Sequence, residues 1–218
     1  MAIATINPAD GRELQRFDEH STAEVDRILD EAQRAFPAWR ARSFADRAAL
    51  LHRAAGHLEQ YLDEHARLIT IEMGKTIVES RAEVKKCAWS CRYFAEHAER
   101  FLAPEPAPSS AAESYVEFPP LGTVLAIMPW NFPYWQLFRF AAPGLMAGNT
   151  AVLKHASNVP QCALAIERVF RESGFPDGVF RTLLVGGARA EALIDDPRIV
   201  AVTLTGSEEV GERVAARA

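Results

Sequence analysis

The chain has 218 residues, 49% of them hydrophobic and 24% charged, which is typical of a globular protein with a substantial core. The formal net charge is −5 and Lys and Arg form no block, so we expect no nucleic-acid partner. An uncharged stretch at 118–136 contains four prolines, which excludes a membrane span there. The N-terminus lacks the pattern of a signal peptide. Three cysteines, few and odd in number, fit the reducing cytoplasm better than a disulfide framework.

Residues 20–102 are predicted to be helical throughout. Ser21 and Glu24 have the spacing of a capping box, and apolar residues then recur at helical spacing as far as Phe36. Pro37 is predicted to end this first helix. Three more helices are expected at 43–61, 63–73 and about 75–102, the second of these ending near Gly74.

Residues 103–114 are rich in Pro and small polar residues and are predicted to break the helical region. Residues 115–118 are β-prone, and the two prolines that follow restrict them to a short strand in an edge position.

From Gly122 onwards, short apolar strands alternate with helices. Such alternation predicts an α/β fold with a parallel sheet covered on both faces, and such sheets bind ligands at the carboxyl ends of their strands. The sequence stops inside the last predicted helix without a Gly or Pro stop signal, so we expect a truncated sheet. The expected strands are 122–128, 150–154, 180–185 and 199–204, and the expected helices are 135–146, 160–173, 188–194 and one that follows Ser207.

The first predicted strand runs into Pro129-Trp130-Asn131-Phe132-Pro133. The two prolines fix φ and make this segment stiff, so that the Asn131 amide is held in one place. A fixed neutral donor suits a developing oxyanion. The alternative is a plain strand-to-helix turn in which Asn131 caps the next helix. The residues alone do not decide between the two.

Three further strand ends carry candidate binding residues. Lys154 could reach ribose hydroxyls or a phosphate, or could be an ordinary surface lysine. Thr205-Gly206-Ser207 opens a helix and offers free N–H groups to a phosphate, or is a plain helix cap. Gly186 is similarly ambiguous, and the usual G-x-G-x-x-G fingerprint is missing.

Other groups in the sequence are less suited to chemistry. Gly74-Lys75-Thr76 resembles the end of a P-loop, but it lies between predicted helices and lacks the first glycine. Cys87, Cys91 and Cys162 are predicted to be buried structural thiols, and no metal site is predicted.

Taken in order and at their spacing, these strand ends resemble the aldehyde dehydrogenase superfamily. The matching segments are PWNFP at 129–133, K-x-x-S at 154–157, the Gly186 turn, TGS at 205–207 and EMGK at 72–75. The text around the first two is similar to bacterial succinate-semialdehyde dehydrogenases. The resemblance implies a Rossmann-like cofactor-binding domain, here incomplete. Its parts would be a helical N-terminal part (1–103), a linker with an oligomerisation-type β segment (104–120) and an NAD(P)-binding part (121–218).

The resemblance also implies roles for individual residues. Asn131 would donate to the oxyanion of the reaction, which is the oxidation of an aldehyde to an acid. Its turn and the Gly-Ser helix opening would lie side by side above the strands and frame a slot for the dinucleotide. The implied cofactor-binding residues are Ile127, Met128, Pro129, Trp130, Asn131, Lys154, Ser157, Gly186, Thr205, Gly206, Ser207 and Val210.

Cofactor and substrate choice would depend on two positions. NAD-preferring members often place Glu where this chain has Ser157, and a carboxylate there would repel a 2′-phosphate. We therefore expect NADP, with NAD possible. Arg139, eight residues after Asn131, resembles the position that holds the carboxylate of succinate semialdehyde. The alternative is an arginine paired with a neighbouring domain.

The resemblance covers the whole chain but only about the first half of a family member. The nucleophilic Cys of G-Q-x-C and the Glu of E-L-G-G are missing, so we expect no turnover from these 218 residues alone. The full-length enzyme is expected to be a homo-oligomer. The alternative is an inactive module that binds a dinucleotide, or a partner through its unpaired sheet edge.

Overall fold

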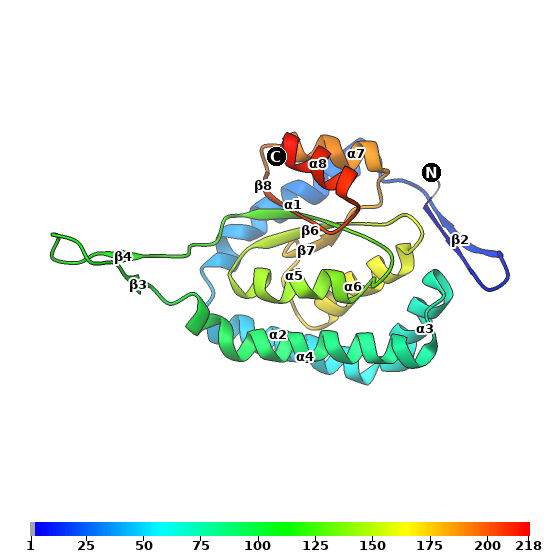
Figure 1. Ribbon diagram of the computed structural model, residues 1–218, viewed down its shortest axis with the longest axis horizontal. Helices are drawn as coiled ribbons and strands as arrows, with labels where there is room; N and C mark the ends of the chain where they lie inside the picture. Colours follow the sequence, from blue (N-terminus) through cyan, green and yellow to red (C-terminus); the bar gives the residue numbers. More distant parts are fainter. Residues whose placement is uncertain (1–2) are drawn as a thin grey trace.

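The computed structural model describes residues 3–218 and is organised around a four-stranded parallel sheet in the order β7-β6-β5-β8 (Figure 1). The predicted parallel sheet is confirmed. The third strand is shorter than predicted, because beyond Thr182 the chain keeps only a single hydrogen bond to β6, from the Leu183 N–H to the Leu153 carbonyl. The strands are β5 (Thr123–Met128), β6 (Thr150–His155), β7 (Phe180–Thr182) and β8 (Ile199–Leu204).

Helices cover both faces of this sheet (Figure 1). One face carries α1 (Thr22–Arg40), α7 (Gly187–Ala192) and α8 (Glu208–Arg217), with the 3-10 turn η1 (Leu193–Asp195) after α7. The other face carries α5 (Trp135–Met146) and α6 (Pro160–Glu172). Outside these two lie α2 (Phe44–Gln60), α3 (Leu62–Met73) and α4 (Ile77–Phe101). Within residues 3–218, no helix combines the length and the hydropathy that crossing a membrane requires.

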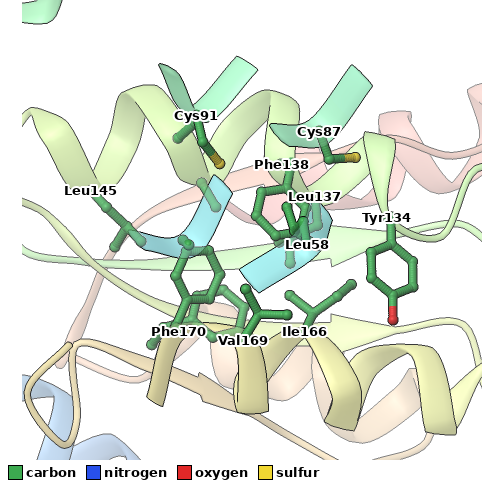
Figure 2. Packing of buried hydrophobic residues seen from close by; sticks show 14 of the residues in the cluster. Leu58, Cys87, Cys91, Tyr134, Leu137, Phe138, Leu145, Ile166, Val169 and Phe170 are labelled. Atoms are coloured by element: carbon green, nitrogen blue, oxygen red, sulfur yellow. The ribbon is translucent and has the colours of Figure 1, made fainter. Parts of the chain in front are cut away.

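Two apolar cores lie on the two faces of the sheet. Successive strand residues point to opposite faces, so Leu125 and Val152 pack towards α1 while Ala126 and Leu153 pack towards α5. We call these the α1-side core and the α5-side core. The α5-side core is the larger, and it joins α2 and α4 to the sheet through the side chains of α5 and α6 (Figure 2). The helical N-terminal region and the sheet therefore share one core.

Local signals in the sequence place most helix ends. Both hydrogen bonds of the capping box at the start of α1 are present. Gly74 ends α3 in the left-handed conformation, with φ 82°, which glycine adopts without steric cost. The prediction that Pro37 ends α1 is wrong, because the helix continues to Arg40. Trp39 is fully buried against Phe175, and this packing holds the last turn in place although Pro37 donates no hydrogen bond.

Two hairpins lie outside the sheet. The first, β1 (Ile3–Ile6) with β2 (Glu13–Phe17), was not predicted. The second pairs β3 (Glu105–Pro106) with β4 (Tyr115–Val116) and extends far from the body as a long arm (Figure 1). The predicted strand at 115–118 is therefore present but shorter. Its partner β3 falls in the segment that was predicted only as a break. Pro106 can take part in this strand because it is in an edge position, where a proline is tolerated.

Candidate functional site

The segments that follow the four strands all lie at one edge of the sheet, because parallel strands end on the same side. In spatial order they carry Gly186 after β7, 154–157 at the end of β6, 129–134 after β5 and 205–207 after β8. From β5 the chain winds outward to β7 and then crosses to β8 on the other side of β5. The winding direction thus reverses between β5 and β8. A ligand crevice is expected at such a reversal in open α/β sheets.

The turn that carries Asn131 and the opening of α8 flank this reversal. Ile127 pairs with Leu204 across β5 and β8, and the Thr205 N–H donates to the Ile127 carbonyl at 3.1 Å. Segments 129–133 and 205–207 therefore leave adjacent strand ends and lie side by side. This is the arrangement that the slot inferred from the sequence requires.

The Asn131 side chain is exposed and does not cap the following helix. Helix α5 has Tyr134 as its N-cap residue and begins without a side-chain cap bond, so the capping alternative for Asn131 is wrong. Trp130 and Phe132, on either side of Asn131, are 50% and 44% exposed. The turn thus presents an amide donor between two accessible aromatic side chains.

Two buried histidines that the sequence analysis missed hold this turn. The pKa of His155 is lowered to about 4 by burial, so its ring is neutral at pH 7 and its Nε2–H donates to the Pro133 carbonyl at 2.8 Å. The Tyr134 hydroxyl, whose pKa burial raises, forms a hydrogen bond with His65 Nδ1 at 2.8 Å. The pKa of His65 is also lowered to about 4, mainly by burial. No local pattern in the sequence marks either residue as an anchor, because each partner lies at least 22 residues away.

On the side of β5 away from β8, the same edge of the sheet carries Lys154, Ser157 and Gly186. The pKa of the half-buried Lys154 is lowered by burial, and the Glu19 carboxylate partly opposes this shift. Glu19 also lies against Gly186, where an added Cβ would be 3.0 Å from Glu19 Oε1. The Ser157 carbonyl accepts from the Ala4 N–H at 3.1 Å, so the β1–β2 hairpin fixes the backbone here. Glu19 was not among the predicted residues.

The opening of α8 leaves backbone donors free. Its N-cap residue is Ser207, and the side chain makes no cap bond to the first turn. An added Cβ at Gly206 would come no closer than 3.8 Å to any other side chain, so the backbone there is open to a ligand. Val210 is partly buried and packs against the α1-side core. Because the Thr205 N–H already donates to the Ile127 carbonyl, the free backbone donors are those of Gly206 and Ser207.

Three of the predicted residues, Met128, Arg139 and Thr205, line a cavity of about 330 Å³ beside β8. Arg139, on α5, is exposed in this cavity, and its Nη2 donates to Thr205 Oγ1 at 3.0 Å. This contact leaves the other guanidinium donors available. Met128 also lines the cavity although its side chain is largely buried in the α5-side core, whereas Ile127 is partly exposed on the opposite face.

The three cysteines are not candidates for the nucleophile. All are buried and free, and burial raises the pKa of each thiol. A thiol held in this way is protonated and inaccessible. The prediction that they are buried structural thiols is confirmed. Over the part of the chain that the structure describes, no group of three or more His, Cys, Asp or Glu side chains is arranged to hold a metal ion.

A parallel sheet wound in two directions, with helices on both faces and open helix N–H groups at its switch point, defines a Rossmann-like α/β domain. The chain belongs to the aldehyde dehydrogenase family, whose sequence model matches residues 1–218.

Other members of this family resemble the chain in both sequence and fold. The chain is 56% identical to a probable NADP(+) succinate-semialdehyde dehydrogenase of Synechocystis, over all of this chain and 48% of that protein. The structure of succinic semialdehyde dehydrogenase from Streptococcus pyogenes in complex with NADP+ superposes with a TM-score of 0.95 at 34% identity, over 99% of this chain and 48% of that one. An NAD-dependent benzaldehyde dehydrogenase from Corynebacterium glutamicum gives 0.93 at 30% identity, over 100% and 48%. The chain thus spans about half the length of these relatives.

Proposed function

We propose that residues 1–218 form the cofactor-binding part of an NADP-dependent aldehyde dehydrogenase that oxidises succinate semialdehyde. The observation that carries this proposal is the pairing of the Asn131 turn with the open start of α8 at the switch point of the sheet. Because the chain spans about half of its relatives, the complete enzyme would also contain the nucleophilic Cys and the general-base Glu. We expect no turnover from the 218 residues alone.

The residues at the sheet edge fit a dinucleotide. Free N–H groups at Gly206 and Ser207, together with the positive end of α8, would hold the pyrophosphate, and Lys154 would reach the adenosine ribose. Glu208 and Glu209, in the first turn of α8, are exposed and therefore screened by solvent. Ile127, Pro129 and Trp130 would line the nicotinamide end. The bound cofactor would accept the hydride of the aldehyde.

Asn131 would stabilise the charge that develops on the aldehyde oxygen. Its amide is neutral and exposed, and it is carried by a turn whose Pro133 carbonyl is held by the buried His155 ring and whose neighbour Tyr134 is bonded through its hydroxyl to the buried His65. A donor that is already in place needs no reorganisation as the oxygen becomes negative, which is the most effective form of electrostatic stabilisation.

A homo-oligomer is part of the same proposal. The arm formed by β3 and β4 exposes apolar side chains that no other part of residues 3–218 covers. We propose that a second copy of the chain covers them, and that the enzyme works in the cytoplasm. The exposed apolar residues of the arm and its base are Tyr115, Val116, Phe118 and Leu121.

Cofactor choice provides the experiment that tests the proposal. The complete enzyme is expected to have a higher kcat/KM with NADP than with NAD, because Ser157 places no negative charge near a 2′-phosphate. Ser157→Glu should lower kcat/KM for NADP by at least about fivefold, since two charges about 4 Å apart near a protein surface repel by roughly 1–4 kcal/mol. The measurement is initial-rate kinetics with both cofactors.

The matched control is Asn158→Glu, which adds the same charge at the next, exposed position and should change the NADP/NAD ratio by less than about threefold. A wild-type enzyme at least about tenfold more efficient with NAD would show that the NADP assignment is wrong.

Substrate choice is tested at Arg139. Arg139→Ala should raise KM for succinate semialdehyde by about 10–100-fold, because a charge-assisted hydrogen bond to a carboxylate contributes roughly 1.5–3 kcal/mol. KM for a neutral aldehyde of similar length should stay within about twofold. Arg139→Lys, which keeps the charge but not the planar fork, should lie in between. Equal increases for both aldehydes would mean that Arg139 acts structurally, for instance through its bond to Thr205.

A further inference from the structure

A third buried side chain, Glu83 on α4, holds the segment that carries Asn131. Its Oε1 accepts from the backbone N–H of Tyr134 at 2.9 Å and from that of Trp135 at 3.0 Å. These are the first donors of α5, and no side chain of α5 itself caps them. The Glu83 side chain is only 2% exposed.

The same carboxylate is paired with a buried cation. Lys75 Nζ forms an ion pair with Glu83 Oε2, and the Lys75 side chain is 8% exposed. Lys75 Nζ also lies 3.6 Å from the centroid of the Phe132 ring, which is the residue directly after Asn131. The pair thus touches the turn at two points, the ring of Phe132 and the backbone of Tyr134 and Trp135.

The geometry explains why a charged pair is buried at this place. A carboxylate out of water is costly unless its lone pairs are filled, and here a cation and two N–H groups fill them. The positive end of α5 adds to this stabilisation. The interaction fixes the start of α5 from α4, while His155 fixes the Pro133 carbonyl from β6. Asn131 lies between two prolines that make the turn stiff. The contacts of Glu83 and His155 with this turn therefore also fix the position of the Asn131 amide.

We propose that the Lys75–Glu83 pair is a positioning unit that sets the location of the Asn131 amide for catalysis. The inference rests on the proposed oxyanion role of Asn131 and adds two residues, on α4 and on the loop before it, that do not touch the substrate. Removing the pair moves the donor and lowers kcat without removing any group that binds the cofactor.

The first test is a double-mutant cycle in the complete enzyme. Glu83→Ala should lower kcat by about tenfold and Glu83→Gln by about threefold, because Gln keeps a neutral acceptor but leaves Lys75 unpaired. KM for the cofactor should change by less than about twofold in both variants. In an Asn131→Ala background, each Glu83 substitution should change kcat by less than about twofold, since there is no longer a donor to position. The control is Glu96→Gln, an exposed glutamate on the same helix, which should leave kcat unchanged.

The outcomes separate the two proposals. If the Glu83 substitutions lowered kcat by the same factor with Asn131 present and with Asn131→Ala, the positioning role would be overturned. Glu83 would then only stabilise the fold. An Asn131→Ala enzyme with unchanged kcat would instead defeat the proposed oxyanion role. Amide hydrogen exchange on the 218-residue chain then decides about Glu83 independently. Glu83→Gln should speed exchange at Tyr134 and Trp135 by at least about threefold and Glu83→Ala by more. Unchanged exchange at these two amides would overturn the proposal.

Discussion

Asn131→Ala is expected to lower kcat of the complete enzyme by about 10²–10³-fold. Loss of one preorganised oxyanion donor has an effect of this size, because a fixed donor stabilises the developing charge without any reorganisation. Asn131 is exposed on the surface of its turn and does not cap α5, so the substitution removes the donor without opening the core. Initial rates under saturating aldehyde and cofactor measure the effect.

The control for this result is the stability of the variant. The thermal midpoint of the Asn131→Ala variant should match that of the wild type, since the side chain is exposed and neutral. Asn131→Asp keeps the shape but replaces the donor by a negative charge, so its kcat should be no higher than that of the Ala variant. A variant that retains more than about a tenth of the wild-type kcat would contradict the role of Asn131.

The sheet and the placement of the site along it could be predicted because both follow from short-range rules. Apolar strand segments separated by helices predict a parallel sheet, and strands that end together bring Lys154, Asn131 and Ser207 to one edge. Capping residues such as Ser21 and Thr76 mark helix starts within one or two positions. Each of these signals can be interpreted from residues that are close together in the sequence.

The supports of the site could not be predicted, because they depend on contacts between distant segments. Glu83 lies 51 residues before Tyr134, and His65 lies 69 residues before it. In the sequence each is an ordinary polar residue on an amphipathic helix. Only the tertiary structure, in which α4 packs against α5 and the His65 side chain of α3 reaches Tyr134, shows that these side chains meet the turn that carries Asn131. A buried polar side chain on the apolar face of a helix is the one signal that could have indicated such a role.

The errors at secondary-structure level have a similar cause. The rule that a proline ends a helix failed at Pro37, because burial of Trp39 stabilises one more turn than the local rule allows. The β1–β2 hairpin was missed because β2 is mostly exposed and lacks a continuous apolar run. Its position is set by contacts with the body, such as the bond from the Ala4 N–H to the Ser157 carbonyl.

Phe170→Ala is expected to have the largest effect on folding, a loss of about 3–5 kcal/mol in the free energy of unfolding. The Phe170 ring is 1% exposed at the centre of the α5-side core (Figure 2). Its centroid lies 5.4 Å from that of Phe138, 5.1 Å from that of Phe175 and 4.6 Å from that of Phe180. These contacts join α5, α6 and β7, so no single element can move to fill the cavity.

The matched control is Phe118→Ala, which makes the same chemical change on the exposed base of the arm, where Phe118 is 42% accessible. Its effect should stay below about 1 kcal/mol. Urea unfolding of the 218-residue chain, followed by circular dichroism at one protein concentration, measures both variants. A total stability of about 5–15 kcal/mol means that the core variant loses a large fraction of it. If Phe170→Ala cost no more than Phe118→Ala, the α5-side core would not be the part of the molecule that holds the helical region to the sheet.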